Sequence, residues 1–356
     1  MGIGRMKKLR IGYWPLSPNL SSAGDRRRLI FWAQARGHTI VTDLTQSVDL
    51  IVASENIDFN SRFFDKTRVP IIFDLVDAYL SPLSPFDDLA RGIAKKISGQ
   101  IGGGVKPFSH HVKDFCLRAN AVICSSVEQE AAVNPYNLNT HAILDSHDEI
   151  PFNDMRGSKA LSRSVTGILW EGQPATLRGI RQISSVLAEL AKENELRFNF
   201  VTDEKYFQYL GKFVQRRTQD LVERELHQAK DRVRIIPWSV DRLVFSASES
   251  TVAMIPINLN VPMQRLKPEN RLLIMWRLGL PCLTSPSPAY RRVADKAGVS
   301  AICVDPNAWL ENFNKLFKDS RFALDEVIRG QDYLMENHNR TSLLKKWDIA
   351  VASVFT

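Results

Sequence analysis

Cations crowd the start of one apolar, helix-forming segment, KPENRLLIMWRLGLP. Lys267, Asn270 and Arg271 lie in or directly before its expected first turn, where the helix dipole already supplies positive charge. Glu269 alone would complement that dipole. The additional cations therefore indicate an anion larger than a side chain, such as a diphosphate, bound at this end of the helix.

A second segment of this kind, EGQPATLRG, places Gly172 directly after an apolar run and Arg178 near the next helix start. A glycine lets the backbone approach an anion, and an arginine can bind two phosphate oxygens at once. Asn258 follows another apolar run. If these runs are parallel strands, their carboxyl ends bring all three residues to one edge of a sheet, together with Lys267.

Small residues also precede a cationic helix start near the N-terminus, in SSAGDRRR. Gly24 could approach a phosphate, and three arginines follow Asp25 in the first turn. The chain contains neither GxGxxG after a strand nor GxxxxGK[ST]. The segment is therefore a candidate anion site of unusual form, and a solvated helix start is the alternative.

Carboxylates follow two apolar runs of the first half. Asp74 and Asp77 lie at the end of VPIIFDLVD, where a carboxylate could accept a proton from a hydroxyl nucleophile. Alternatively, Asp77 caps the next segment. The run LDSHDE groups acidic residues and His147 beyond another strand, and we interpret it as a polar cluster near a hinge rather than as a metal site.

The elements that would position these residues are short apolar runs alternating with helical segments, which predict parallel sheets covered on both faces. In the first half, we expect strands at 9–14, 49–54, 69–77, 120–126 and 140–145. In the second half, we expect them at 165–172, 196–203, 233–238, 251–257, 281–285 and 301–305.

The polar segment 148–164 separates the two series and has no apolar period, so we expect an interdomain linker there. We expect residues 1–155 and 156–335 to form two doubly wound, Rossmann-like α/β domains that face each other across a cleft. Residues 336–356 form an additional C-terminal helix.

The composition is that of a globular protein. The 356 residues are 44% hydrophobic and 24% charged, and the formal net charge of +8 favours anionic partners. The four cysteines are scattered, which predicts buried thiols in a reducing compartment rather than a metal site or disulfides. We see no signal peptide, membrane span or nucleic-acid-binding motif, and expect a cytoplasmic protein without a nucleic-acid partner.

Taken in order, four segments resemble the GT-B glycosyltransferases, and most closely their retaining group 1 branch. These segments are GDRRRLIFWAQARGHTI, NAVICSS, EGQPATLRG and PENRLLIMWRLGLPCLTS. Many relatives have two glutamates eight positions apart where this chain has Leu266 and Ile274, and an arginine where it has Gln173. The resemblance implies that donor recognition differs here and that the C-terminal helix returns to the first domain.

The resemblance implies transfer of a sugar from a nucleotide-diphosphate sugar to an acceptor hydroxyl, in glycan, polysaccharide or glycolipid biosynthesis. The nucleotide sugar is a co-substrate, with neither a metal nor another cofactor, and the acceptor is a glycan or a lipid-linked molecule. Retention and inversion of configuration both remain open. The alternatives are a GT-B protein that binds nucleotide or glycan without catalysis, and a sugar-nucleotide epimerase or hydrolase. The donor-binding candidates are Gly24, Gly172, Arg178, Asn258, Lys267, Asn270 and Arg271, and the catalytic candidates are Asp25, Asp74 and Asp77.

The segment DDLARGIAKKISGQI has isoleucines at helical spacing, at positions 93, 97 and 101, with Arg91, Lys95 and Lys96 between them. Such a helix suits peripheral binding to the inner face of an anionic membrane. The alternative is a helix that packs its apolar side on its own domain.

Overall fold

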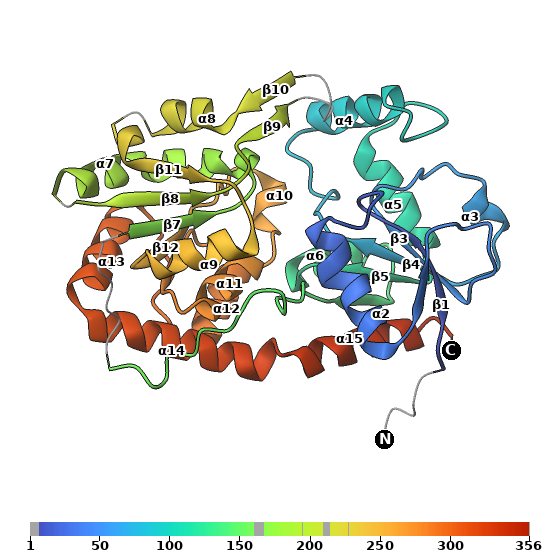
Figure 1. Cartoon of the computed structure of the whole chain (residues 1–356). Helices are drawn as coiled ribbons and strands as arrows, with labels where there is room; N and C mark the ends of the chain where they lie inside the picture. Colours follow the sequence, from blue (N-terminus) through green and yellow to red (C-terminus); the bar gives the residue numbers. More distant parts are fainter. Residues whose placement is uncertain (1–6, 160–166, 194, 209–213, 227, 356) are drawn as a thin grey trace. The chain divides into compact units, whose positions relative to one another are not determined.

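The computed structural model describes residues 7–159, 167–193, 195–208, 214–226 and 228–355. It contains two compact units, one formed by Met1–His147 with Arg340–Thr356 and the other by Asp148–Asn339. Figure 1 shows that each unit has its own sheet with helices packed against it. No helix within the described ranges is long and apolar enough to cross a membrane.

The first unit is built on a parallel sheet with the strand order β2-β1-β3-β4-β5-β6. Its strands are β1 (Arg10–Trp14), β2 (Thr39–Val41), β3 (Leu50–Ser54), β4 (Ile71–Leu75), β5 (Ala121–Cys124) and β6 (Thr140–Ala142). Every residue of β3, β4 and β5 is buried, as the continuous apolar runs predict for strands covered on both faces.

Alternate residues of these strands enter two separate cores. Leu50 and Val52 pack with the helices α2 (Phe31–Arg36) and α15 (Arg340–Ala352), whereas Ile51 and Ala53 pack with α5 (Phe108–Arg118) on the other face. The helices of this unit are α1 (Ala23–Asp25), a π-helical segment (Arg26–Ile30), α2 (Phe31–Arg36), α3 (Phe63–Lys66), α4 (Pro85–Ile97), α5 (Phe108–Arg118), α6 (Val127–Val133) and α15 (Arg340–Ala352).

The C-terminal helix α15 is part of the first unit's core. The ring of Trp347 stacks on that of Trp32 with 5.8 Å between their centroids, and both side chains are buried. Asp348 accepts a hydrogen bond from Trp32 Nε1 at 2.8 Å and from Arg36 Nε at 3.0 Å. The last turns of the chain therefore complete one face of the first sheet.

The second unit contains a five-stranded parallel sheet with the order β11-β8-β7-β12-β13 and an antiparallel pair, β9 with β10. Its strands are β7 (Gly167–Glu171), β8 (Arg197–Val201), β9 (Lys205–Gln208), β10 (Val214–Arg217), β11 (Val233–Ile236), β12 (Val252–Ile255) and β13 (Cys282–Thr284). The expected α/β class with two parallel sheets is confirmed. The pair β9–β10 was not expected.

The helices of the second unit surround this sheet (Figure 1). They are the 3₁₀ helices η2 (Pro174–Ile183) and η3 (Lys230–Arg232), and the α-helices α7 (Ser184–Glu193), α8 (Thr218–Glu225), α9 (Val240–Ser248), α10 (Pro262–Arg265), α11 (Asn270–Arg277), α12 (Pro288–Ala297), α13 (Pro306–Lys318) and α14 (Ser320–Asn337).

Two sequence expectations need correction. The strand expected at 301–305 is a single bridge between Ile302 and Thr284, because the chain turns at Asp305, which caps α13. Ile101 was expected on one helix face with Ile93 and Ile97, but α4 ends at Ile97 and Ile101 is buried. The four cysteines are buried thiols, as expected.

The described part of segment 148–164 packs on the second unit, and residues 160–164 lie outside the described ranges. The backbone N–H of Asn153 donates to the carbonyl of Arg277 at 2.9 Å. The amide of the buried Gln331 accepts from Met155 N at 3.0 Å and donates to Asn153 O at 2.7 Å. These bonds fix the segment against α11 and α14.

Candidate functional site

Two of the predicted phosphate-binding segments meet at the carboxyl edge of the second sheet. Gly172 follows β7, and Arg271 lies in the first turn of α11. The Nη1 atom of Arg271 donates to the carbonyl of Glu171 at 3.1 Å, and a Cβ placed on Gly172 would lie 3.0 Å from that nitrogen. The glycine thus leaves room for the guanidinium, and the fold joins segments that are far apart in the sequence.

Arg271 is held from a second side by Tyr290, a buried residue of α12 that hydrogen-bonds to it. Burial raises the pKa of the Tyr290 hydroxyl to about 12, although the positive charge of Arg271 acts in the opposite direction. Tyr290 is therefore a neutral partner at physiological pH. The Glu171 carbonyl and the Tyr290 hydroxyl therefore hold the guanidinium through uncharged groups.

Glu269, directly before α11, is paired within the protein. It is buried and forms an ion pair with Arg292, with 3.2 Å between Glu269 Oε1 and Arg292 Nη2. Its charge is therefore balanced within the protein. The start of α11 therefore combines the positive end of the helix dipole with the guanidinium of Arg271.

Asn270, the first residue of α11, has an unusual side chain. Its Oδ1 atom is buried and has no hydrogen-bond partner among the described residues. The two ends of an amide are interchangeable by rotation, so this position can accept from a hydroxyl or donate to an oxyanion. A buried polar atom without a partner is costly, so this side chain is a position where the described residues leave a polar group unsatisfied.

The loop before α11 carries Lys267 and Asn258. Lys267 is half-buried between α10 and α11. Asn258 orders the loop after β12, since its Oδ1 accepts from Gln182 Nε2 and from Asn260 N, each at 3.1 Å. Its amide oxygen therefore already has partners within the protein, so Asn258 shapes the site through the loop it holds.

Arg178 lies on η2 at the same edge of the sheet. Its neighbour Gly179 permits this position, because a Cβ there would lie 2.3 Å from the carbonyl oxygen of Pro256, just beyond β12. The Arg178 side chain is exposed, and no ion pair to it is found in the described part of the chain. It is therefore free to turn toward a bound anion.

An aromatic residue that was not predicted also lies at this edge. Trp238 follows β11, and its Nε1 atom donates to Glu171 Oε1 at 3.0 Å. The bond joins the ends of β11 and β7 beside Gly172. Gly172 was selected because it directly follows an apolar run that forms a strand. Trp238 lies at the end of another such run, so the same criterion could have selected it from the sequence.

In the first unit, Asp25 has no exposed surface. It accepts hydrogen bonds from Tyr13 Oη at 2.6 Å, from Leu16 N at 2.8 Å, and from both N and Oγ of Ser17. The space that a Cβ would take at Gly24 is filled by the Leu16 side chain, 2.4 Å away. Asp25 and Gly24 therefore organise the loop after β1.

Asp74 forms a buried ion pair with Arg28, with 2.6 Å between Oδ1 and Nη2. The guanidinium also donates to the carbonyl of Ile143 at 2.8 Å and to Asp145 at 3.2 Å. Burial raises the pKa of the Asp74 carboxyl, although Arg28 acts in the opposite direction. Both side chains are inside the unit, where they join β4 to the segment after β6.

Asp77 is half-buried beyond β4 and lies next to a carboxyl group that was not predicted to be part of a site. Glu55 Oε2 accepts from Val76 N at 2.7 Å and from Asp77 N at 3.2 Å. Burial, followed by the charge of Asp77, raises the pKa of Glu55 to about 8. Tyr79 hydrogen-bonds to Asp77, so the edge of the first sheet carries a carboxyl pair and a phenol.

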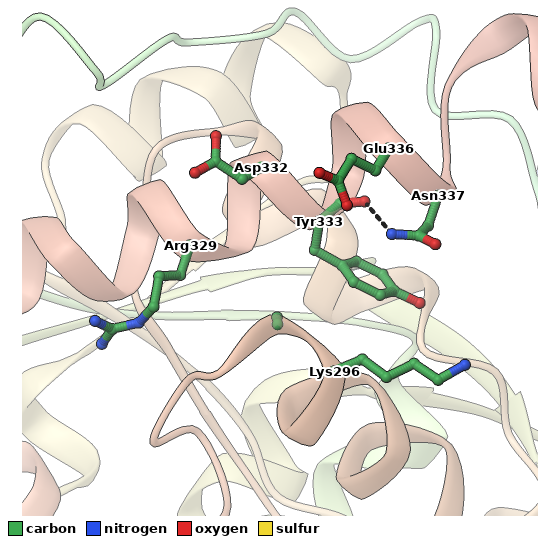
Figure 2. Close-up of a pocket in the computed structure, with 7 residues that line it drawn as sticks. Lys296, Arg329, Asp332, Tyr333, Glu336 and Asn337 are labelled. Carbon is green, nitrogen blue, oxygen red and sulfur yellow. Dashed lines mark hydrogen bonds between the residues drawn. The ribbon is translucent and has the colours of Figure 1, made fainter.

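A polar hollow of about 510 Å³ lies elsewhere on the second unit, between α12 and α14. Figure 2 shows Lys296 and Arg329 in it, with Asp332 and Glu336 on α14. Asn337 Nδ2 donates to the Tyr333 carbonyl at 3.1 Å. The charges are of mixed sign, and none of the predicted site residues lines this hollow.

Comparison with family models and with curated proteins finds no match to the sequence. The fold, however, is that of solved GT-B glycosyltransferases. The chain is similar to HepE from Anabaena, solved with UDP and glucose, with a TM-score of 0.62, 12% identity, and 97% and 100% of the two chains covered. It is also similar to sucrose-phosphate synthase from Thermosynechococcus elongatus, with a TM-score of 0.60, 14% identity, and 96% and 80% covered.

A third neighbour is WaaG, a glycosyltransferase involved in lipopolysaccharide biosynthesis. The TM-score is 0.56 at 12% identity, and the match covers 96% of this chain and 99% of that one. The expected GT-B architecture is thus confirmed across nearly the whole chain.

Proposed function

We propose that this protein transfers a sugar from a nucleotide-diphosphate sugar to an acceptor hydroxyl. The observation that carries the proposal is the meeting of Gly172 and Arg271 at the carboxyl edge of the second sheet. Ligands of such sheets bind at this edge, and a glycine beside an arginine and a helix start suits a diphosphate. The HepE neighbour was solved with UDP and glucose, which supports the same class of donor.

The main catalytic contribution is stabilisation of the departing diphosphate. Arg271 is positioned by the Glu171 carbonyl and Tyr290, so its charge needs little reorganisation as negative charge develops on the leaving group. Lys267 and the exposed Arg178 add charge from the neighbouring loop and from η2. The amide of Asn270, a half-buried residue in the first turn of α11, binds a hydroxyl or an oxygen of the donor.

On the acceptor side, Asp77 is the carboxylate best suited to take a proton from a hydroxyl. Asp25 and Asp74 are buried and bonded to groups inside the unit, whereas Asp77 is half-buried at the sheet edge. Burial, followed by the charge of Asp77, raises the pKa of the adjacent Glu55 to about 8, so Glu55 is largely protonated at neutral pH. The acceptor is a glycan or a lipid-linked molecule.

One observation favours a second candidate, a protein that binds a nucleotide without transferring sugar. Ile274 stands where many GT-B relatives have a glutamate, and it is buried in α11. Donor sugar recognition must then come from other residues or be absent.

The test is isothermal titration calorimetry with UDP, GDP and CMP, followed by a screen of intact nucleotide sugars for slow hydrolysis. We expect one nucleotide to bind, and Arg271→Ala to weaken binding by at least tenfold, about 1.4 kcal/mol. Arg197→Ala is the matched control, since Arg197 is an exposed arginine at the opposite, amino end of β8.

If none of the three nucleotides binds, both candidates are excluded. Binding without hydrolysis of any nucleotide sugar, and without transfer to any acceptor, would favour the second. An equal loss in Arg197→Ala would show that general charge, rather than the site, governs binding.

A further inference from the structure

Glu171, the last residue of β7, presents two different groups at the carboxyl edge of the second sheet. Its carbonyl oxygen accepts from Arg271 Nη1 at 3.1 Å, and its carboxylate accepts from Trp238 Nε1 at 3.0 Å. Arg271 belongs to α11, which packs on β12 and β13, whereas Trp238 follows β11. Since β12 and β11 lie on opposite sides of β7 in the sheet, the carboxylate and the guanidinium are held from opposite directions.

Three strands end at the same level beside the Glu171 carboxylate. Glu171 is the register partner of Val201 in β8, and Val201 is the partner of Ile236 in β11. Trp238 lies two residues beyond Ile236, so its indole reaches Glu171 across the end of β8. The hydrogen bond therefore directs the carboxylate toward β8 and away from α11.

A carboxylate in this position selects for a ligand group that donates hydrogen bonds. An ionised carboxylate has roughly four acceptor positions and no donor, so it can bind other donors in addition to Trp238 and it repels phosphate. Glu269 does not serve this purpose, because it is buried and paired with Arg292. In dinucleotide-binding sheets, a carboxylate near the phosphate site accepts a hydrogen bond from a ribose hydroxyl.

A hollow of about 350 Å³ at the end of β11 indicates which part of the donor lies on this side. Its lining includes Ile236 and Pro237, directly before Trp238, and Phe245 and Arg242 of α9. The Phe245 ring is 54% exposed. Apolar walls with an exposed aromatic ring and a guanidinium suit the planar base of a nucleotide. A base in this hollow places the ribose between β11 and the diphosphate, at the level of β7.

We propose that Glu171 binds the ribose hydroxyls of the donor nucleotide and that Trp238 holds the carboxylate in place for this contact. The diphosphate lies at Gly172 and Arg271, and the base lies toward β11. Glu171 thereby determines specificity for a ribonucleotide over a deoxyribonucleotide. This inference rests on the proposed function, because it requires a nucleotide at this edge of the sheet.

The test is isothermal titration calorimetry of the full chain, in EDTA, with the nucleotide that binds among UDP, GDP and CMP and with its 2′-deoxy and 3′-deoxy forms. We expect the wild type to bind the ribonucleotide about tenfold or more tightly than at least one deoxy form. Glu171→Gln keeps the shape of the side chain and an acceptor for Trp238. It should reduce this ratio to within about threefold by weakening the binding of the ribonucleotide alone.

Glu189→Gln is the matched control, since Glu189 is an exposed glutamate of α7 in the same unit, and it should leave the ratio unchanged. Glu171→Asp is a second variant. It keeps the charge but withdraws the carboxylate by one methylene, and it should also lower the ratio. Unchanged Tm values would show that the variants fold.

The outcomes separate this inference from the proposed function. If no nucleotide binds to the wild type, the proposed function itself fails. If a nucleotide binds but the wild type does not distinguish it from its deoxy forms, or if both Glu171 variants keep the wild-type ratio, only the ribose contact is overturned. An equal loss of affinity for the ribonucleotide and the deoxy forms in Glu171→Gln would also overturn it, because such a loss assigns Glu171 to the support of the site.

Discussion

At the scale of single residues, the fit between Gly172 and Arg271 is the most exacting feature of the candidate site. The glycine is needed because a Cβ would lie 3.0 Å from Arg271 Nη1 and 2.9 Å from Thr176 Oγ1. A spacing of this kind is tighter than ordinary van der Waals contact, so the neighbours must move.

We predict that Gly172→Ala displaces the guanidinium and weakens nucleotide binding about tenfold, with a stability loss of about 1–2 kcal/mol. Calorimetry and urea unfolding measure the two effects. Gly157→Ala is the control, since a Cβ at Gly157 meets nothing within 4 Å. Unchanged affinity in Gly172→Ala would mean that the nucleotide does not use Arg271.

A second residue-scale prediction concerns Glu55, whose pKa is raised to about 8 in the folded protein. The pKa of an unfolded glutamate is near 4.3. At pH values between this pKa and the folded pKa, Glu55 keeps a proton in the folded state that it has lost in the unfolded state, so the free energy of unfolding falls as pH rises. Glu55→Gln removes this dependence.

The variant should gain stability relative to the wild type between pH 5 and pH 8, on the order of 1–3 kcal/mol. Urea unfolding at several pH values measures this difference, with Glu128→Gln as the control in the same unit. A difference that stays constant across this range, or that favours the wild type at high pH, would contradict the assignment.

At the scale of elements, α11 is held in place from behind by α14. Gly330 of α14 lies against the buried Trp276 of α11, and a Cβ there would lie 2.4 Å from the indole ring. Gln331 adds a hydrogen bond to the Trp276 carbonyl at 3.0 Å. The helix that presents Arg271 therefore depends on a contact on its far side.

We predict that Gly330→Ala destabilises the protein by about 1–3 kcal/mol through overpacking. The sign is diagnostic, because Gly→Ala within an unconstrained helix stabilises by about 0.5–1 kcal/mol. Urea unfolding of the single and double variants with Trp276→Ala gives the coupling between the two residues. An equal effect in both backgrounds would exclude the contact as the cause.

At the scale of the whole molecule, the chain's last helix completes the core of the first unit. Trp347 and Asp348 contact Trp32 and Arg36, more than 300 residues earlier in the sequence. Removal of the Asp348 carboxylate leaves the buried Trp32 Nε1 without its acceptor, which is costly inside a core.

We predict that Asp348→Ala destabilises the first unit by about 2–3 kcal/mol, whereas Lys345→Ala, at an exposed position of the same helix, has little effect. Hydrogen exchange with mass spectrometry separates the units. Protection should fall in β1 and β3 and stay unchanged in β7 and β8. An equal loss in both sheets would contradict a contribution confined to the first unit.

The sequence alone predicted the buried strands and the cationic helix starts, because both depend on local patterns. Continuous apolar runs match β3, β4 and β5, and the residues after β7 and at the start of α11 were selected by type and position. Two segments that each suit a phosphate were therefore visible before their contact was known.

Only the tertiary structure decided which charged groups are available. Asp74 and Arg28 are 46 positions apart and neutralise each other inside the unit. The carboxylate of Asp25 accepts hydrogen bonds from Tyr13 and from the loop after β1. The orientation of α4, which leaves Phe86 and Ile97 exposed, was equally invisible, because its amphipathic pattern is the same whichever side is buried. Burial and pairing depend on contacts between distant segments, and local sequence carries no record of them.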